Sequence, residues 1–188
     1  PQEGQIDLLV QTLHALVYLH RRGIVHRDIK PDNILVVDGH VKMLDFGLAV
    51  AHEQINEDEA VVGTLAYLAP EVLQGFNASE VSDIYAIGMI AYEIFAGQYP
   101  FLTDNVTHLI QDIVNTMPEI DTLGLRPEFA HLLKQMLEKN PNLRLKSAAE
   151  IIERYATITG QDAVKDSVNI RESFLQAAQF VGREHELA

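Results

Sequence analysis

The most apolar stretch of the chain, residues 84–96, constrains the fold more than any other segment. It belongs to a helix-forming run that starts at Ser82 and is apolar on nearly all sides, as is typical of a helix enclosed by other helices. The stretch is too short to span a bilayer, and it contains Tyr85, Tyr92 and Glu93. Gly97 suits its C-terminal cap. The sequence therefore predicts a domain built around a buried central helix.

A second helix and a hairpin are predicted before it. Apolar residues recur at helical spacing from Ile6 to His20, and Gly23 provides a stop. Two short β-prone runs, Ile34–Val37 and Val41–Leu44, are separated by Asp38-Gly39-His40, and an Asp-Gly pair accommodates the positive φ angles of a hairpin turn. Residues 48–68 show no sustained period and are predicted to form a long loop.

The second half of the chain is predicted to be mainly helical. We expect a helix over 103–114, and another that has Pro127 at its first position. Ser147 and Glu150 form a capping box ahead of a helix over 151–155.

Composition limits the class of protein. At 188 residues the chain is long enough for one domain with a core. Its formal net charge of -13 opposes binding to nucleic acid or to anionic lipid surfaces, so no nucleic-acid partner is expected. With no cysteine and no recognisable leader, the chain is interpreted as cytoplasmic. The eight histidines suggest no zinc site, and His14 and His20 are interpreted as helix-surface residues.

Six short motifs follow one another along the chain, and their order is more informative than any one of them. They are HRDIKPDN at 26–33, DFG at 45–47, Gly63-Thr64, LAPE at 68–71, Asp83 with Gly88, and Arg144. Together they resemble the C-terminal lobe of a eukaryotic-like (Hanks-type) bacterial serine/threonine protein kinase over roughly residues 5–158. The resemblance implies a mainly α fold with a small β-hairpin beside the catalytic loop and no N-terminal β lobe.

The resemblance also implies roles for particular residues in phosphoryl transfer from ATP. Asp28 occupies the position of the catalytic base, and Lys30 that of the lysine that contacts the transferring phosphate in serine/threonine kinases. Asn33 and Asp45 match the family's Mg²⁺ ligands. Their side chains offer the hard oxygen ligands that suit this ion. Leu35 matches the residue that lies beneath the adenine, and Thr64 matches the substrate-side threonine.

Other matches are expected to hold geometry. His26 and Phe46 correspond to members of the family's hydrophobic spine, and Asp83 to the carboxylate that holds the catalytic-loop backbone. Glu71 and Arg144 match a buried ion pair of the family, so an ion pair is expected between them. Tyr85 stands where the family often has tryptophan, a change expected to affect packing only.

Arg27 precedes the catalytic Asp, as in the subgroup whose activation loop is commonly ordered by a phosphate on that arginine. The loop at 48–68 contains no serine, and its hydroxyl groups are Thr64 and Tyr67. One hypothesis is that acidic side chains replace the phosphate on Arg27. The alternative is a solvated acidic loop; the acids are Glu53, Glu57, Asp58 and Glu59.

The expected domain order is a kinase C-terminal lobe at 1–158, a linker or loosely packed helix at 159–179, and a further segment at 180–188. That last segment resembles the opening of a P-loop ATPase domain, and a polar tail is the alternative. The 188 residues hold no Gly-rich loop and no lysine before Lys30. We therefore expect the missing N-terminal lobe to act in cis within a multidomain bacterial signalling protein, and the fragment alone to be inactive.

Two other functions stay open at this point. A pseudokinase or scaffold would use the lobe as an interaction surface, and a kinase-like small-molecule phosphotransferase would share the catalytic Asp and Asn. The leading expectation is a parent kinase that uses ATP and Mg²⁺ on protein serine or threonine. Self-association through the apolar interlobe face near Leu35 and Phe46 is a further expectation.

Overall fold

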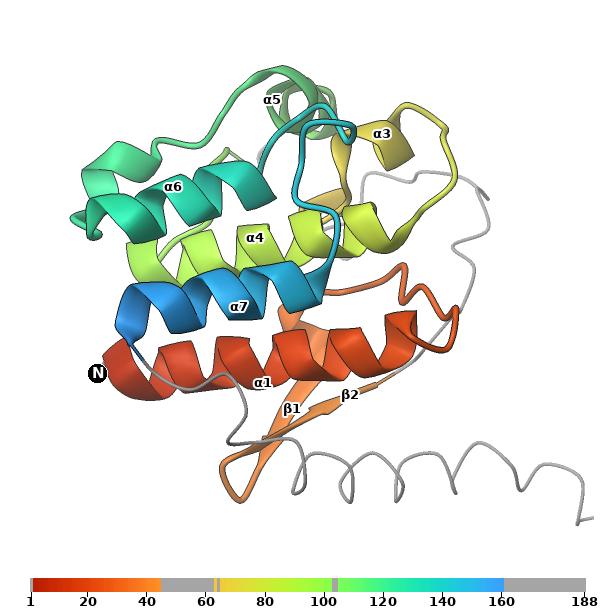
Figure 1. Ribbon diagram of the computed structural model, residues 1–188. Helices are drawn as coiled ribbons and strands as arrows, with labels where there is room; N and C mark the ends of the chain where they lie inside the picture. Colours follow the sequence, from red (N-terminus) through yellow and green to blue (C-terminus); the bar gives the residue numbers. More distant parts are fainter. Residues whose placement is uncertain (1, 45–62, 64, 103–104, 161–188) are drawn as a thin grey trace, which may run out of the picture.

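The computed structural model describes residues 2–44, 63, 65–102 and 105–160, with side chains from Gly4 onward. The elements in chain order are α1 (Gln2–His20), η1 (Pro31–Asn33), β1 (Ile34–Val37), β2 (His40–Met43), α3 (Pro70–Leu73), α4 (Glu80–Ala96), α5 (Val106–Asn115), η2 (Ile120–Leu123), α6 (Pro127–Met136) and α7 (Ala148–Thr159). In the part of the chain that is described, the elements are mainly helical with one two-stranded sheet, which confirms the expected fold class (Figure 1).

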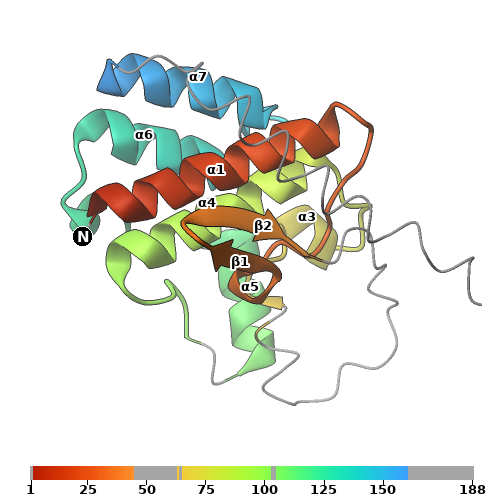
Figure 2. The same ribbon diagram turned by 90° about the horizontal axis from the view of Figure 1, so that it is seen from below.

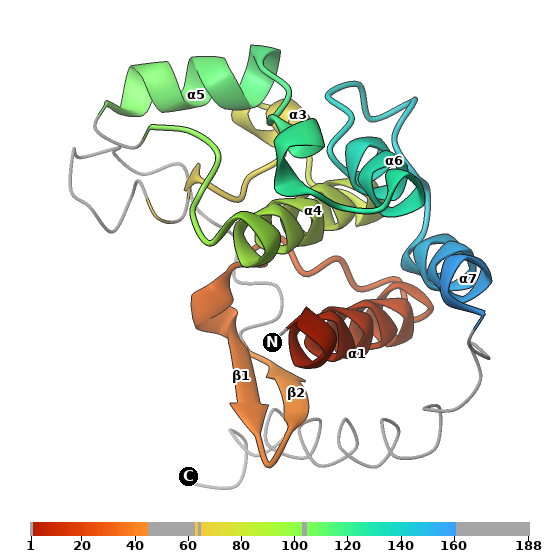
Figure 3. The same ribbon diagram turned by 90° about the vertical axis from the view of Figure 1, so that its left-hand side faces the viewer.

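Four helices form the body of the domain. Helix α4 packs against α1 and α6, while α7 packs against both α1 and α6. Viewed end-on, α1 and α7 lie side by side, with α4 and α6 in the layer above them and α3 and α5 beyond that layer (Figure 3). The hydrophobic core lies between these helices and includes Leu16, Ile87, Leu133 and Ile151.

Helix α4 is the central helix that the sequence predicts. Every residue from Ser82 to Tyr92 is buried, and Gly97 ends the helix in the left-handed conformation with φ 71°. The helix begins at Glu80, two residues earlier than expected, because the Ser79 backbone N–H donates to Ser82 Oγ at 2.7 Å and closes the first turn. A Cβ at Gly88 would lie 2.9 Å from a Leu137 methyl carbon, so glycine lets the chain after α6 approach α4 closely.

The hairpin is antiparallel, with Ile34 opposite Met43 and Val37 opposite His40. Its turn places Asp38 at φ 52° and Gly39 at φ 77°, as expected for Asp-Gly. Strand β2 packs against α1 (Figure 2). Gln11 of α1 strengthens this contact: its amide donates to Gly39 O at 3.1 Å and accepts from Val41 N at 2.9 Å.

Helix ends in the second half follow local capping rules. Asn105 caps α5, and Ser147 caps α7 by accepting from Glu150 N at 3.2 Å. The Glu150 carboxylate accepts from Lys146 N at 3.4 Å. Helix α7 continues to Thr159 and is therefore longer than expected.

Helix η2 was not anticipated. Residues 48–62 and 64 of the loop predicted over 48–68, and the segment 161–188, lie outside the described residues. None of the described helices combines the length and the hydropathy that a membrane-spanning segment needs.

Candidate active site

The catalytic-loop segment that follows α1 is held by one buried carboxylate, Asp83 of α4. Its Oδ2 accepts from the His26 backbone N–H at 2.9 Å, and its Oδ1 accepts from the Arg27 backbone N–H at 3.0 Å. Arg27 has φ 74°, a left-handed conformation that is unfavourable for a residue with a side chain. Because the carboxylate is 2% exposed and accepts both bonds, it stabilises this turn against relaxation.

His20 is a third partner of Asp83. Its Nε2 lies 2.8 Å from Asp83 Oδ2, and its side chain is only 7% exposed. The expectation of a helix-surface histidine is therefore wrong. The reason is tertiary: the last turn of α1 packs against the first turn of α4, so the ring points to a carboxylate 63 residues away. No local pattern around His20 signals this contact.

Three of the predicted site residues come together at η1. The Asn33 side-chain amide donates to the Asp28 carbonyl oxygen at 2.7 Å and to Asp28 Oδ2 at 2.8 Å. The Lys30 ammonium lies 3.2 Å from the same Oδ2. Asn33 is buried and also accepts from Leu44 N at 2.9 Å through its backbone, which ties the loop to the end of the hairpin. The carboxylate of Asp28 is thus fixed by an amide and an ammonium group.

The same residues suit a hard cation only in part. Both contacts of the Asn33 side-chain amide use Nδ2, so its side-chain oxygen Oδ1 is the atom that can coordinate Mg²⁺. Asp45, the second predicted ligand, and Thr64 lie outside the described residues, as do Phe46 and the four acids proposed to pair with Arg27. Among the residues that are described, no group of three or more His, Cys, Asp or Glu could hold a metal. Leu35, predicted to lie beneath adenine, is 44% exposed on β1.

His26 lies beneath the loop and is fully buried. Burial lowers the pKa of its imidazole below the usual value, although the nearby Asp83 and Asp28 carboxylates oppose the shift. Its Nδ1 accepts from the Asp28 backbone N–H at 3.4 Å, which requires this nitrogen to be unprotonated. The contact agrees with a neutral ring that supports the loop backbone.

Two tyrosine hydroxyl groups hold the end of the predicted activation segment against α4 and the chain just after it. Tyr67 donates its hydroxyl to Glu93 at 2.5 Å, and Tyr99 donates to the Ala66 carbonyl oxygen. The two rings pack edge to face with centroids 5.8 Å apart. Burial, followed by the bond to Glu93, raises the pKa of Tyr67. Sequence reasoning missed Glu93 and Tyr99, which bear no motif of their own.

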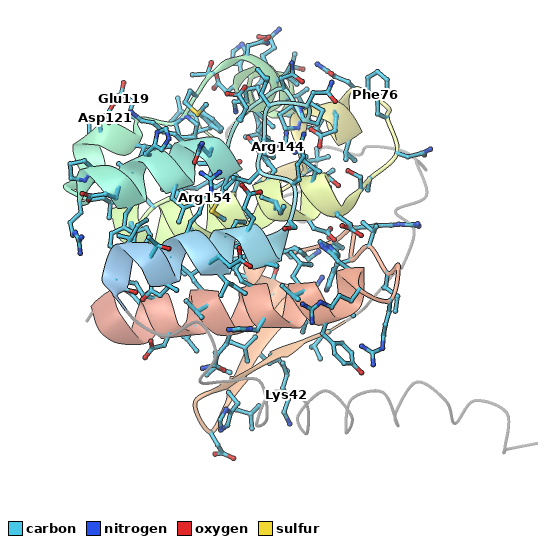
Figure 4. The ribbon with its side chains drawn as sticks, in the orientation of Figure 1. Lys42, Phe76, Glu119, Asp121, Arg144 and Arg154 are labelled. Atoms are coloured by element: carbon cyan, nitrogen blue, oxygen red, sulfur yellow. The ribbon has the colours of Figure 1, made fainter. Side chains whose placement is uncertain are left out.

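The expected ion pair between Glu71 and Arg144 is present. The two guanidinium NH₂ groups lie 2.7 and 2.9 Å from the two carboxylate oxygens, and Arg144 is 1% exposed (Figure 4). Arg144 also donates to the carbonyl oxygens of Val81, Glu138 and Lys139. It thereby joins α3, α4 and the chain after α6 in one buried cluster.

Tyr85 belongs to this cluster, so the expectation that it affects packing only is wrong. Its ring is fully buried with the Arg144 guanidinium 5.0 Å from the ring centroid, and its hydroxyl accepts from the Lys139 ammonium at 3.0 Å. Burial, with the Arg144 charge next in size, lowers the pKa of Lys139 to about 8. A tryptophan at this position would offer lysine no oxygen acceptor.

The family model for the protein kinase domain matches residues 2–155. The chain therefore belongs to the protein kinase domain family. Among curated proteins it is 37% identical to a probable serine/threonine-protein kinase pknA2 of Bifidobacterium longum, over 81% of this chain and 22% of that protein. It is 36% identical to the serine/threonine-protein kinase PknA of Mycobacterium tuberculosis, over 81% and 36%. It is also 38% identical to PknL of the same species, over 79% and 39%. The chain thus spans less than half the length of these relatives.

Proposed function

We propose that this chain provides the catalytic loop and substrate-binding face of a bacterial serine/threonine protein kinase, which transfers the γ-phosphate of ATP to a protein hydroxyl. The observation that carries the proposal is the arrangement at η1. The Asn33 amide and the Lys30 ammonium both contact Asp28 Oδ2, at 2.8 and 3.2 Å. We assign Oδ1 as the atom that receives the proton of the substrate hydroxyl.

Lys30 has a second role in this proposal. Its side chain is 19% exposed beside a carboxylate that is 20% exposed, so the ammonium can reach a phosphate while it stays close to Asp28. Asn33 and Asp45 would hold Mg²⁺, which when bound neutralises charge on the phosphates. Leu35 would contact the adenine, and Thr64 would orient the substrate side of the loop. Protein kinases in general use ATP and Mg²⁺, which supports this assignment.

The direct test uses the complete parent protein and purified Asp28→Asn and Asp38→Asn variants. We expect Asp28→Asn to lower kcat by about 10²- to 10⁴-fold, the usual value of general-base catalysis. Asp38 carries the same change in the exposed hairpin turn, where asparagine tolerates the φ of 52°, so this control should retain activity. Equal activity in the parent and the Asp28→Asn variant would contradict the proposal.

The same assay separates the alternatives. A pseudokinase or scaffold would give no transfer from labelled ATP in any form of the parent, whereas a small-molecule phosphotransferase would modify small hydroxyl compounds and not serine or threonine peptides. The contacts of Tyr67 with Glu93 and of Ala66 with Tyr99 favour protein substrates, because they fix the loop expected to face a peptide. An N-terminal lobe supplied in cis is part of the proposal. The 188 residues assayed alone should therefore show no transfer.

Two expectations about the rest of the chain are retained as proposals. Leu35 and Val37 are 44% and 41% exposed, and because they are two residues apart on β1 they share one apolar face. An N-terminal lobe would cover this face, and the isolated chain would self-associate through it. Light scattering of the 188 residues against the complete parent tests this. A boundary near 158, with a linker at 159–179 and a second domain from 180, predicts protease cleavage after α7 that leaves residues 1–158 intact.

A further inference from the structure

The side chain of Lys139, in the chain after α6, contacts neutral groups. Its Nζ lies 2.7 Å from the Ile113 carbonyl oxygen of α5 and 3.0 Å from the Tyr85 hydroxyl oxygen of α4. The ring centroids of Tyr85 and Phe101 lie 5.2 and 5.3 Å from the same nitrogen. The ammonium is therefore bound by two uncharged oxygen atoms and two aromatic rings.

Two other lysines of the described chain contact carboxylates instead. Lys30 Nζ lies 3.2 Å from Asp28 Oδ2, and Lys134 Nζ lies 2.7 Å from Asp121 Oδ1. Within the described residues, Lys139 forms no ion pair of this kind. Because a nearby carboxylate favours the charged form of an amine, Lys139 lacks an interaction that would keep it protonated.

Burial and a neighbouring cation also act against the ammonium form of Lys139. The Arg144 guanidinium is 1% exposed and lies 5.0 Å from the centroid of the same Tyr85 ring. Burial, with the Arg144 charge next in size, lowers the pKa of Lys139 to about 8. The carboxylates of Asp112 and Glu138 oppose the shift. About a quarter of the Lys139 side chains are then neutral at pH 7.5, compared with about one in a thousand at the ordinary pKa of 10.5.

The hydrogen-bond geometry suits a neutral amine that acts as a nucleophile. Such an amine has two hydrogen atoms and one lone pair, and two oxygen acceptors lie within 3.0 Å of Nζ. When both hydrogen atoms are donated, the lone pair is left to react. Lys139 is only partly buried, which limits access to small reagents. Desolvation and a neighbouring cation are two ways in which proteins activate lysine as a nucleophile.

We propose that Lys139 is an acylation site that accepts an acyl group from a small acyl phosphate. Nζ attacks the acyl carbon, an N–C bond forms, and the C–O bond to the phosphate breaks. Inorganic phosphate leaves with the electron pair, and the surplus proton on nitrogen passes to water. The product is a neutral amide with a single N–H, which can serve only one of the two acceptors. Acylation therefore removes one link between α4 and α5.

Acetylation of the folded 188-residue chain with acetyl phosphate, followed for each lysine by peptide mass spectrometry, tests the proposal. Lys134 is the internal reference, because its side chain is 39% exposed but paired with Asp121. Lys139 should react about tenfold faster at pH 7.5, because its neutral fraction outweighs the lower reactivity of a less basic amine. In urea the two rates should become similar. A folded chain in which Lys134 reacts at least as fast, or a preference that persists in urea, would overturn the proposal.

The pH dependence of the rate is a second measurement. Acetylation of Lys139 should accelerate up to about pH 8 and then level off, because the amine is then mostly neutral. Nα-Acetyl-lysine in the same solution, with the ordinary pKa of about 10.4, should continue to accelerate up to about pH 10. Parallel profiles for Lys139 and this reference compound would overturn the proposal.

A matched pair of variants at Phe101 tests the surroundings of the amine. Phe101→Glu places a carboxylate beside the Lys139 ammonium and should lower its acetylation rate about threefold relative to Phe101→Gln, which removes the same ring without adding charge. Circular dichroism identifies folded variants. Equal rates in the two folded variants would overturn the proposal.

Asp112→Asn provides the opposite test, which stays available if the Phe101 variants unfold. This change on α5 removes a carboxylate that opposes the pKa shift of Lys139, so acetylation of Lys139 should become about twofold faster at pH 7.5. The rate at Lys134 in the same sample should not change. A Lys139 rate that is unchanged or lower in the folded Asp112→Asn chain would contradict the proposal.

Discussion

Two buried carboxylates of this domain, Asp83 and Glu71, are compensated in different ways. Asp83 accepts hydrogen bonds from two backbone N–H groups and contacts His20, whereas Glu71 faces the fully charged guanidinium of Arg144. The first arrangement fixes a short loop with an unfavourable φ, and the second joins three separate parts of the helical body. A carboxylate held by backbone dipoles therefore determines local geometry, whereas one held by a buried cation determines whether the helical body stays assembled.

The largest expected effect comes from removing the cation. Arg144→Met should lower the free energy of unfolding by about 3–5 kcal/mol, because Glu71 is left as a buried charge without its partner. Urea unfolding followed by circular dichroism measures this.

The double variant Glu71→Leu/Arg144→Met should recover much of that loss, because neither charge then remains buried. Lys134→Met, which breaks the exposed pair with Asp121, is the control and should cost less than about 1 kcal/mol. If the double variant were no more stable than Arg144→Met, the loss would come from packing rather than from the unpaired charge.

Removal of Asp83 should lower the free energy of unfolding less than removal of Arg144 does. For the same loss of stability, however, it should lower activity more. Asp83→Ala leaves two buried backbone donors and His20 without their acceptor, and we expect a loss of about 2–3 kcal/mol. In the complete parent, kcat should fall with little change in the KM for peptide, since the Asp28 position is disturbed.

Asp83→Asn is a sharper version of this experiment. It keeps an oxygen acceptor for one backbone donor but adds a donor where another acceptor was, so its effect should lie between the parent and Asp83→Ala. His20→Phe tests the third contact and should lower stability by about 1 kcal/mol. A fully active, fully stable Asp83→Asn protein would show that the carboxylate charge is dispensable.

The pH dependence of stability should report His26. Its folded pKa lies below the ordinary value of 6.5, so between these two pKa values the unfolded chain binds more protons than the folded one. The contribution of His26 to the free energy of unfolding is therefore fully present above pH 6.5. It is lost as the pH falls from 6.5 towards the lower pKa of the folded state. Urea unfolding of the parent and of His26→Phe across this window measures the difference. Parallel stability curves for the two proteins would contradict a buried neutral His26.

The smallest effect is expected at the edge of the arginine cluster. Tyr85→Phe removes one acceptor of the Lys139 ammonium, which keeps its bond to the Ile113 carbonyl oxygen at 2.7 Å, so a loss of about 1 kcal/mol is expected at pH 7. The loss should shrink above pH 8, where Lys139 becomes neutral and a weaker donor. A loss that does not change with pH would assign the effect to ring packing alone.

Local signals predicted much of the fold. Period and caps located α1, α4 and α6 because a helix is stabilised by neighbours three or four residues apart. The Asp-Gly pair located the hairpin because these two adjacent residues accommodate the positive φ angles of its turn. The start of α4 was missed because Ser79 and Ser82 close the first turn ahead of the apolar run. Helix η2 carries no period that a single sequence would reveal.

The sequence alone determined the family, since six motifs in order leave few other interpretations, and it predicted Asp28, Lys30 and Asn33, which lie together. Two contacts between distant parts of the chain became visible only in the folded structure: His20 contacts Asp83, and Tyr85 accepts a bond from Lys139. The physical reason is range. Helix periods, turns and catalytic loops are set by residues close in the chain, whereas these contacts join helices whose relative positions depend on packing of the whole core.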